Sequence, residues 1–173
     1  MASPTIGSLF TQRVVVGVGD MAVSNNPQMV LSTYALGSCV GIVAYDSVMK
    51  VGGLLHILLP DSTLSPQKAA AQPGMFADTG LPIFFNALYG LKAHPARMRL
   101  FVCGGASVLS GHDPFKIGDR NVAATLTYLS QQGLVVRQRD VGGTVNRTIH
   151  LEISSGSLEL KTPIATSRCL LTG

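Results

Sequence analysis

The chain has 173 residues, of which 46% are hydrophobic and 13% charged, with 19 glycines and a mean hydropathy of +0.35. This length fits one domain that buries roughly 70% of its unfolded surface, and the composition favours a compact, strand-rich body. The net charge is +4, but the basic residues are scattered and Trp is absent. The sequence therefore indicates neither a basic stripe nor a stacking platform for nucleic acid.

The N-terminal residues 1–12 read as a loose leader that is rich in Ser, Thr, Gly and Pro. The leader lacks the basic region and long apolar core of a signal peptide, and no apolar run reaches the roughly 18 residues that a membrane span needs. The three cysteines are an odd number without a CxxC pair, which argues against a disulfide framework and a structural zinc site. We expect a cytoplasmic protein without membrane insertion.

Four extended runs are predicted in the first third of the chain, over residues 13–19, 29–36, 39–45 and 51–59. The fourth run is apolar at odd and even positions, as expected of a strand covered on both faces. A turn at residues 46–50 joins the third and fourth runs, so these two strands should be neighbours. The polar residues 62–74 that follow read as a surface loop.

Apolar residues at helical spacing predict two helices in the rest of the chain. The first covers residues 77–91, and Pro82 either opens it or kinks it. The second starts at a cap formed by Gly118-Asp119 and ends before Gly133. Further strands are expected at residues 98–103 and 134–136 and in a hairpin of residues 149–160. The sum predicts an α+β fold in a single domain with about two helices.

His56 stands in an unusual setting, because its neighbours on both sides are aliphatic. A buried imidazole without a hydrogen-bond partner costs on the order of 1–3 kcal/mol, so His56 taken alone favours a core histidine bonded to a backbone carbonyl. Cys39 changes this balance. It follows Gly37 at a corner that opens a strand, and the turn at residues 46–50 places it at the same end as His56. A Cys39–His56 pair for nucleophilic catalysis is geometrically plausible, against the alternative that Cys39 is a small buried hydrophobe.

The other thiols and histidines indicate structural or surface roles. Cys103 competes with Cys39 because it also ends a strand, but we interpret it as core filler. Cys169 lies in a polar tail. The remaining histidines are predicted at the surface: His94, His112 and His150.

Two possible cofactor sites are set aside. Residues 17–22 fit a GxGxxA pattern, but Asn25-Asn26-Pro27 cannot continue the helix that a dinucleotide site requires. A metal site of Cys39, His56 and Asp61 lacks closely spaced ligand pairs. We expect no cofactor and no metal.

Seven motifs occur in order over roughly residues 14–161. They are Gly17-Val18-Gly19 with Met21-Ala22-Val23, Leu36-Gly37-Ser38-Cys39-Val40, Gly52-Gly53 through His56 to Pro60, Pro73-Gly74-Met75-Phe76-Ala77-Asp78, Gly104-Gly105-Ala106, Ile117-Gly118-Asp119-Arg120-Asn121 and Asp140-Val141-Gly142-Gly143. Together they resemble the CheD family, the chemoreceptor glutamine deamidases of bacterial and archaeal chemotaxis. Val108 and the offset of Asn146-Arg147 depart from the family pattern and bear on substrate choice and partner binding.

This resemblance implies a sandwich-like α+β domain of mixed β-sheets over residues 13–161, related to toxin-type cysteine deamidases, with a tail of unknown role at 162–173. It implies hydrolysis of glutamine side chains on the cytoplasmic helices of chemoreceptors through a Cys thioester. Cys39 aligns with the family nucleophile, His56 with its base and Thr33 with the residue that orients the imidazole. Backbone N–H groups near Ser38 and Cys39 would hold the oxyanion.

Two alternatives stay open. A glutamate methylesterase would use the same chemistry on an ester. A non-catalytic module would bind and regulate a CheC-type chemotaxis phosphatase, although the intact set of Cys39, His56 and Thr33 argues against loss of catalysis. The expected main partner is the chemoreceptor cytoplasmic domain, with no nucleic acid.

Overall fold

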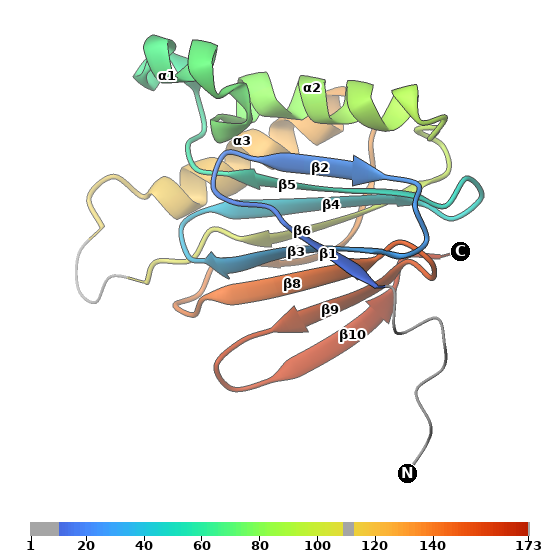
Figure 1. The fold of residues 1–173 in the computed structure, drawn as a ribbon. Coiled ribbons are helices and arrows are strands. Elements are labelled where there is room, and N and C mark those ends of the chain that lie inside the picture. The colour runs from blue at the N-terminus through green and yellow to red at the C-terminus, as the bar shows by residue number, and fades with distance from the viewer. Residues whose placement is uncertain (1–10, 109–112, 173) are drawn as a thin grey trace.

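The computed structural model describes residues 11–108 and 113–172, which form three layers (Figure 1). The bottom layer is a five-stranded sheet, here called sheet A. Its strands, in spatial order, are β1 (Gln12–Val15), β3 (Met29–Leu36), β8 (Arg147–Glu152), β9 (Ser157–Lys161) and β10 (Thr166–Leu170). Only β1 and β3 are parallel; the other neighbours in this sheet are antiparallel.

The middle layer is a second five-stranded sheet, sheet B. Its spatial order is β2 (Met21–Ser24), β5 (Val51–Ile57), β4 (Val40–Asp46), β6 (Met98–Gly104) and β7 (Val136–Val141). Every residue of β4 and β5 is buried, because sheet A covers one face of these strands and helices cover the other. The prediction of a strand covered on both faces is confirmed for β5.

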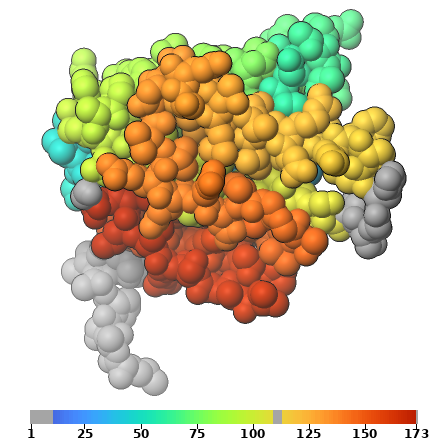
Figure 2. Space-filling view, turned by 180° about the vertical axis from the view of Figure 1, so that it is seen from behind, coloured from blue at the N-terminus to red at the C-terminus, as the bar shows by residue number. Residues whose placement is uncertain are grey.

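The top layer consists of the helices α2 (Ala77–Gly90) and α3 (Ile117–Gln131), which lie over sheet B (Figure 1). Seen from behind, the segment that contains α3 and β7 lies between α2 and the C-terminal strands (Figure 2). Two hydrophobic cores result, one between the helices and sheet B and one between the two sheets. The predicted α+β class, with two sheets in a sandwich and two long helices, is confirmed.

Asp46 fixes the turn between β4 and β5. Its fully buried carboxylate accepts hydrogen bonds from the backbone N–H groups of Val48, Met49 and His94, at 3.0–3.2 Å. It also forms a salt bridge with Arg97 at 2.8 Å. The predicted turn at residues 46–50 is confirmed, and these contacts set the register of β4 and β5, the two strands that the turn joins.

Several boundaries differ from the sequence predictions. Residues 62–74 are not a plain loop, because they contain two 3₁₀ turns, Ser62–Leu64 and Pro73–Met75, and the short helix α1 (Pro66–Ala71). Pro66 at the first helical position and the alanines after it favour that helix. The predicted strand at residues 13–19 ends at Val15, because the chain turns at Gly19 (φ +78°) and enters β2.

The helices and one later strand also differ from the sequence predictions. Pro82 is the sixth residue of α2 and lies inside it. Helix α3 begins at Ile117, so the predicted cap at Gly118-Asp119 is wrong and both residues lie in its first turn. The predicted strand at residues 134–136 starts at Val136 and runs to Val141. Its middle residues are exposed and polar, which hid the strand from a search for apolar runs.

The segment that the sequence left without a role, residues 162–173, contains β10. This strand pairs with β9 and extends sheet A by one strand. Residues 1–10 of the predicted leader lie outside the described residues, while Gln12 already belongs to β1. Within residues 11–108 and 113–172, no helix is both long enough and apolar enough to cross a membrane.

Candidate active site

The register of β4 and β5 brings Cys39 and His56 to one face of sheet B. Gly41 lies opposite His56, and Val40 opposite Ile57. Since side chains alternate between the faces of a sheet, Cys39, two residues before Gly41, faces the same side as His56. Cys39 lies one residue before β4 and just beyond the last ladder pair, Val40–Ile57, so it flanks the end of the ladder on the face of His56.

This face points toward sheet A. A Cβ atom on Gly41 would meet Leu36 Cδ1 at 2.8 Å and Ile149 Cδ1 at 3.2 Å, and both residues belong to sheet A. Glycine at this position thus lets the two sheets approach beside His56. Cys39 itself packs in the core between the sheets.

Thr33 completes the group from β3 in sheet A. Its Oγ1 lies 2.8 Å from His56 Nδ1 and donates a hydrogen bond of 2.6 Å to the carbonyl oxygen of Val16. A threonine hydroxyl carries one proton, so with that proton donated to Val16, Oγ1 accepts from Nδ1–H. The neutral imidazole therefore carries its proton on Nδ1, and Nε2 keeps the lone pair that a general base needs.

Burial within this group decreases toward Cys39. The exposed fraction is 0% for Thr33, 2% for His56 and 9% for Cys39, so Cys39 is the most exposed of the three residues. His56 Nε2 is buried and has no hydrogen-bond partner among the described residues. The structure thus leaves this nitrogen without a competing partner on the face that it shares with the thiol.

Burial also sets the resting protonation of the pair. It raises the pKa of the Cys39 thiol, opposed by the residue's own backbone N–H. It lowers the pKa of His56, opposed by the Val16 carbonyl and the Asp20 carboxylate. Both directions favour the neutral forms, the thiol of Cys39 and the uncharged imidazole of His56.

A glycine-rich loop supports the backbone at Cys39. Gly105 N–H donates to the Cys39 carbonyl and Ala106 N–H to the Gly37 carbonyl, both at 2.8 Å. Gly104 has φ +107°, and a Cβ there would lie 2.1 Å from the Cys39 carbonyl oxygen. Only glycine fits such an approach, which gives the Gly104-Gly105-Ala106 motif a physical role.

The competing thiols are placed differently. Cys103 is fully buried, and desolvation raises its pKa to about 12, opposed by the charge of Arg147. Its prediction as core filler is confirmed. Cys169 is partly buried on β10.

Among the other histidines, His94 is exposed as predicted, and His112 lies outside the described residues. The prediction that His150 lies at the surface is wrong. Its side chain faces outward from sheet A but is only 8% exposed. Ser32 Oγ lies 2.7 Å from its Nδ1 and the Tyr34 ring packs edge-on against it, so neighbouring side chains cover it.

Residues from the two patterns that were set aside lie at the start of β2 and in a 3₁₀ cap. Residues 17–22 include the start of β2 (Met21–Ser24) and lead into that strand, not into a helix. Asp61 caps a 3₁₀ turn by accepting a 2.7 Å hydrogen bond from Thr63 N–H.

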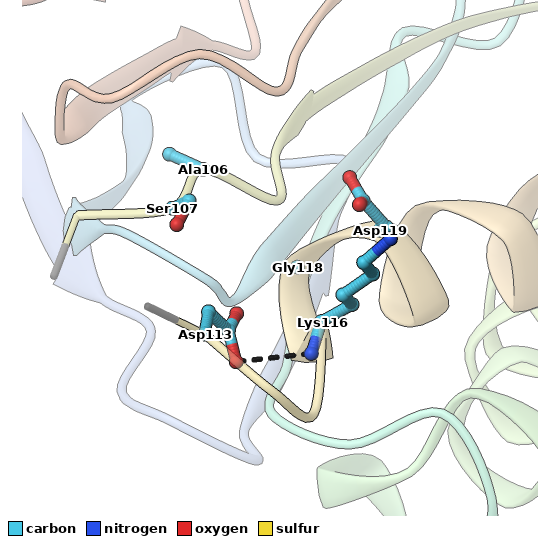
Figure 3. A pocket seen from close by; sticks show the side chains of 6 residues that line it. All are labelled: Ala106, Ser107, Asp113, Lys116, Gly118 and Asp119. Atoms are coloured by element: carbon cyan, nitrogen blue, oxygen red, sulfur yellow. Dashed lines mark hydrogen bonds between the residues drawn. The ribbon is translucent and has the colours of Figure 1, made fainter. Parts of the chain in front are cut away.

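Two adjoining hollows lie beside the Cys39 corner. The smaller, of about 180 Å³, lies between the loop after β6 and the start of α3 (Figure 3). There Lys116 N–H donates to Asp113 Oδ1 at 2.9 Å. The larger, of about 390 Å³, shares part of that lining and is otherwise bounded by Ser38, Val108, Phe115 and Ile117. Ser38, the residue before the nucleophile candidate Cys39, thus lines the larger hollow.

Sequence reasoning missed two contributors to this site. Val16 acts through its backbone carbonyl, for which no residue type gives a signal. Asn121 donates from α3 to the carbonyls of Ser38 and Leu58. In the sequence, only its position at the end of the motif of residues 117–121 pointed to Asn121.

Comparison with known proteins places these features in a family. The family model described as "CheD chemotactic sensory transduction" matches residues 58–162. "Probable chemoreceptor glutamine deamidase CheD 1" of Syntrophus aciditrophicus is 45% identical over 148 residues, covering 86% of this chain and 92% of the relative. The similarly named protein of Pyrococcus abyssi is 38% identical over 154 residues, covering 88% and 93%.

A solved structure, the hypothetical protein YfiH of Bacillus licheniformis, aligns with 78% of this chain and 59% of its own at a TM-score of 0.43 and 14% identity. That likeness is too low to support an argument about fold or function. The two sequence relatives are well above 30% identical, and each match covers more than four fifths of both chains. The chain belongs to the CheD family.

Proposed function

We propose that this protein is a cysteine hydrolase that converts glutamine side chains on the cytoplasmic helices of chemoreceptors to glutamate. The observation that carries the proposal is the placement of Cys39, His56 and Thr33. The first two share one face and one end of β4 and β5, and the hydrogen bonds of Thr33 leave His56 Nε2 as the base. The printed names of the CheD relatives support the same substrate class.

In the first half-reaction, His56 Nε2 takes the proton of the Cys39 thiol while the sulfur attacks the glutamine Cδ. The carbonyl oxygen becomes an oxyanion. Among the described residues, the N–H groups of Ser38 and Cys39 donate to no backbone carbonyl, and the Cys39 N–H interacts with the residue's own sulfur. These are the donors that would hold the oxyanion. The imidazolium then returns its proton to the leaving nitrogen, ammonia departs and a thioester remains.

In the second half-reaction, a water molecule gives its proton to His56 Nε2 and attacks the thioester carbon. The intermediate collapses to the glutamate carboxyl group and expels the sulfur, which regains its proton from the imidazolium. In both halves positive charge appears on His56. Thr33 Oγ1 accepts the hydrogen bond of Nδ1–H and in turn donates its own proton to the Val16 carbonyl, and this chain of hydrogen bonds stabilises that charge.

No step of this mechanism uses a cofactor. Ser107 lines both hollows, and Ser38, the residue before Cys39, lines the larger one, so these hollows would hold the residues that flank a target glutamine. A protein with this substrate would act in the cytoplasm, where it would meet the receptor helices.

Two second candidates use the same surface. A methyl ester of glutamate presents the same acyl carbon with a better leaving group, so the site would support a methylesterase as well. A module that regulates a CheC-type phosphatase would not need the alignment of Thr33, His56 and Cys39, and that alignment favours the enzyme.

The test compares the wild type with Cys39→Ala on a receptor cytoplasmic fragment, in separate unmodified and methylated preparations. Peptide mass spectrometry follows the conversion of glutamine and of methyl glutamate to glutamate. We expect conversion of glutamine by the wild type only. Conversion of the ester alone would favour the methylesterase, and equal glutamate from both proteins would exclude the enzyme.

A further inference from the structure

The chain segments that contain Cys39 and His56 stop pairing with each other at the site. Their ladder ends at the pair Val40–Ile57. Beyond it, the N–H groups of Leu58 and Leu59 both donate to the Met75 carbonyl, at 2.9 and 3.0 Å. On the other side, the Cys39 carbonyl accepts from Gly105 N–H. Past their last pair, the two segments are therefore bound to different neighbours.

The side chain of Asn121 bridges this separation. Its Nδ2 donates to the Ser38 carbonyl and to the Leu58 carbonyl, each at 2.9 Å. An amide nitrogen carries two protons, so both are used in this bridge. The two acceptors flank the site, since Ser38 precedes Cys39 and Leu58 lies two residues after His56. One fully buried side chain thus joins both segments across the gap.

The position of Asn121 is itself fixed by close backbone packing. A Cβ on Gly118 would lie 2.5 Å from the Gly105 carbonyl oxygen, and one on Gly105 would lie 2.3 Å from Val122 Cγ2. The first turn of α3 therefore sits directly on the loop that holds Cys39. Asn121 follows three residues after Gly118 on the same helix, so its amide is presented at a defined point relative to Cys39.

We infer that Asn121 is a positioning residue, which sets the distance and direction between Cys39 Sγ and His56 Nε2. The ladder holds His56 opposite Gly41, but Cys39 lies outside β4, and β5 ends one residue after His56. Without the bridge, the two segments would be tied only to their separate neighbours. The inference rests on the proposed function for its effect on turnover, but not for its effect on the thiol.

Thr125 provides a matched control for a purely structural role. It lies one turn after Asn121 on α3, is also fully buried, and its Oγ1 has no hydrogen-bond partner among the described residues. Asn121→Leu and Thr125→Val both replace a buried polar group with an apolar one of similar size. Only the first removes a contact with the Cys39 and His56 segments.

The experiment measures three quantities for the wild type and both variants in a Cys169→Ser background. They are the thermal midpoint, the pH profile of Cys39 alkylation by iodoacetamide, followed on the Cys39 peptide, and kcat and KM for deamidation. A misplacement of about 1 Å can cost up to roughly 100-fold in rate. For Asn121→Leu we expect kcat to fall by about 10- to 100-fold with little change in KM, and the alkylation profile to change. For Thr125→Val we expect kcat and the alkylation profile to match the wild type.

An alkylation profile of Asn121→Leu that matches the wild type, with only the thermal midpoint lowered, would overturn the inference. A changed profile in a protein whose wild type does not deamidate would sustain the inference and refute the proposed function. If Asn121→Leu does not fold, Asn121→Ala, which admits water to the two carbonyls, is measured in the same way and judged by the same outcomes.

Discussion

Two histidine–hydroxyl pairs lie back to back on β3. On the inner face of the strand, Thr33 Oγ1 is 2.8 Å from His56 Nδ1. On the outer face, the adjacent Ser32 presents its Oγ at 2.7 Å from His150 Nδ1. Both histidines are buried, and burial is the main cause that lowers the pKa of each. By geometry alone, either pair resembles part of a catalytic group.

The pairs differ in what lies next to the imidazole. His56 shares its face with the thiol of Cys39, and its Nε2 has no other partner among the described residues. His150 lies opposite Glu159 on β9. Hydrogen bonds from Lys161 and Arg168 lower the pKa of Glu159 to about 2. Glu159 is therefore a carboxylate that forms ion pairs with these two residues. A histidine and a hydroxyl do not make a site without a nucleophile on the histidine's free side.

The largest expected effect separates the two buried thiols between the sheets. Cys39→Ala removes the nucleophile, so we expect no glutamate above background. Cys103→Ala removes a core side chain whose pKa is about 12, and we expect near wild-type turnover with lower stability. Deamidation assays and urea unfolding of both variants make the comparison. Normal turnover by Cys39→Ala would contradict the assignment of Cys39 as the nucleophile.

The next effect separates the two histidines. His56→Gln removes the base, and general acid–base catalysis typically contributes about 10²- to 10⁴-fold, so kcat should fall within that range. His150→Gln should leave kcat within about twofold, since no reacting group contacts it on the outer face of sheet A. Equal losses in the two variants would mean that the outer pair takes part in the reaction.

A smaller effect separates the two hydroxyls. Thr33→Val removes the hydrogen-bond acceptor of Nδ1–H, and a lost buried hydrogen bond of about 1–3 kcal/mol corresponds to roughly a 5- to 150-fold fall in kcat. Thr33→Ser keeps the hydroxyl and should recover most of the rate. Ser32→Ala, its neighbour on the other face, should change kcat little. A Thr33→Val enzyme with normal kcat would show that the hydroxyl does not orient His56.

The smallest effect is on stability. Folding lowers the pKa of His56 below its ordinary value of 6.5. As the pH falls below 6.5, the unfolded chain therefore binds more protons than the folded protein does. Wild-type stability should therefore decline as pH falls from 6.5 toward the folded pKa. His56→Gln should decline less, while the contribution of His150, of the same sign, remains in both proteins. Urea unfolding at about pH 7.5 and about pH 5 measures this difference, and equal declines would contradict it.

The sequence predicted the parts of the site that depend on strand order and register. The short turn at residues 46–50 was enough to place Cys39 and His56 at one end of neighbouring strands. Thr33 was identified only through the family resemblance, because it contacts His56 from the other sheet. How two sheets stack depends on side chains throughout the core, and local patterns do not report it.

Other features escaped prediction for different physical reasons. The polar edge strand β7 and the strand β10 are stabilised by pairing with their neighbours, so their own residues show little apolar periodicity. His150 faces outward as its alternation indicates, yet Ser32 and Tyr34 cover it. Alternation tells which face a side chain lies on, but not what covers that face.

The most direct test of the account is whether the thiol and the imidazole act as a unit. The measurement is the rate of Cys39 alkylation near neutral pH in the wild type, His56→Gln and His150→Gln, each in the Cys169→Ser background. If Nε2 takes the thiol proton, the rate should fall in His56→Gln and stay at the wild-type value in His150→Gln. A wild-type rate and pH profile in His56→Gln would contradict the pairing of Cys39 with His56.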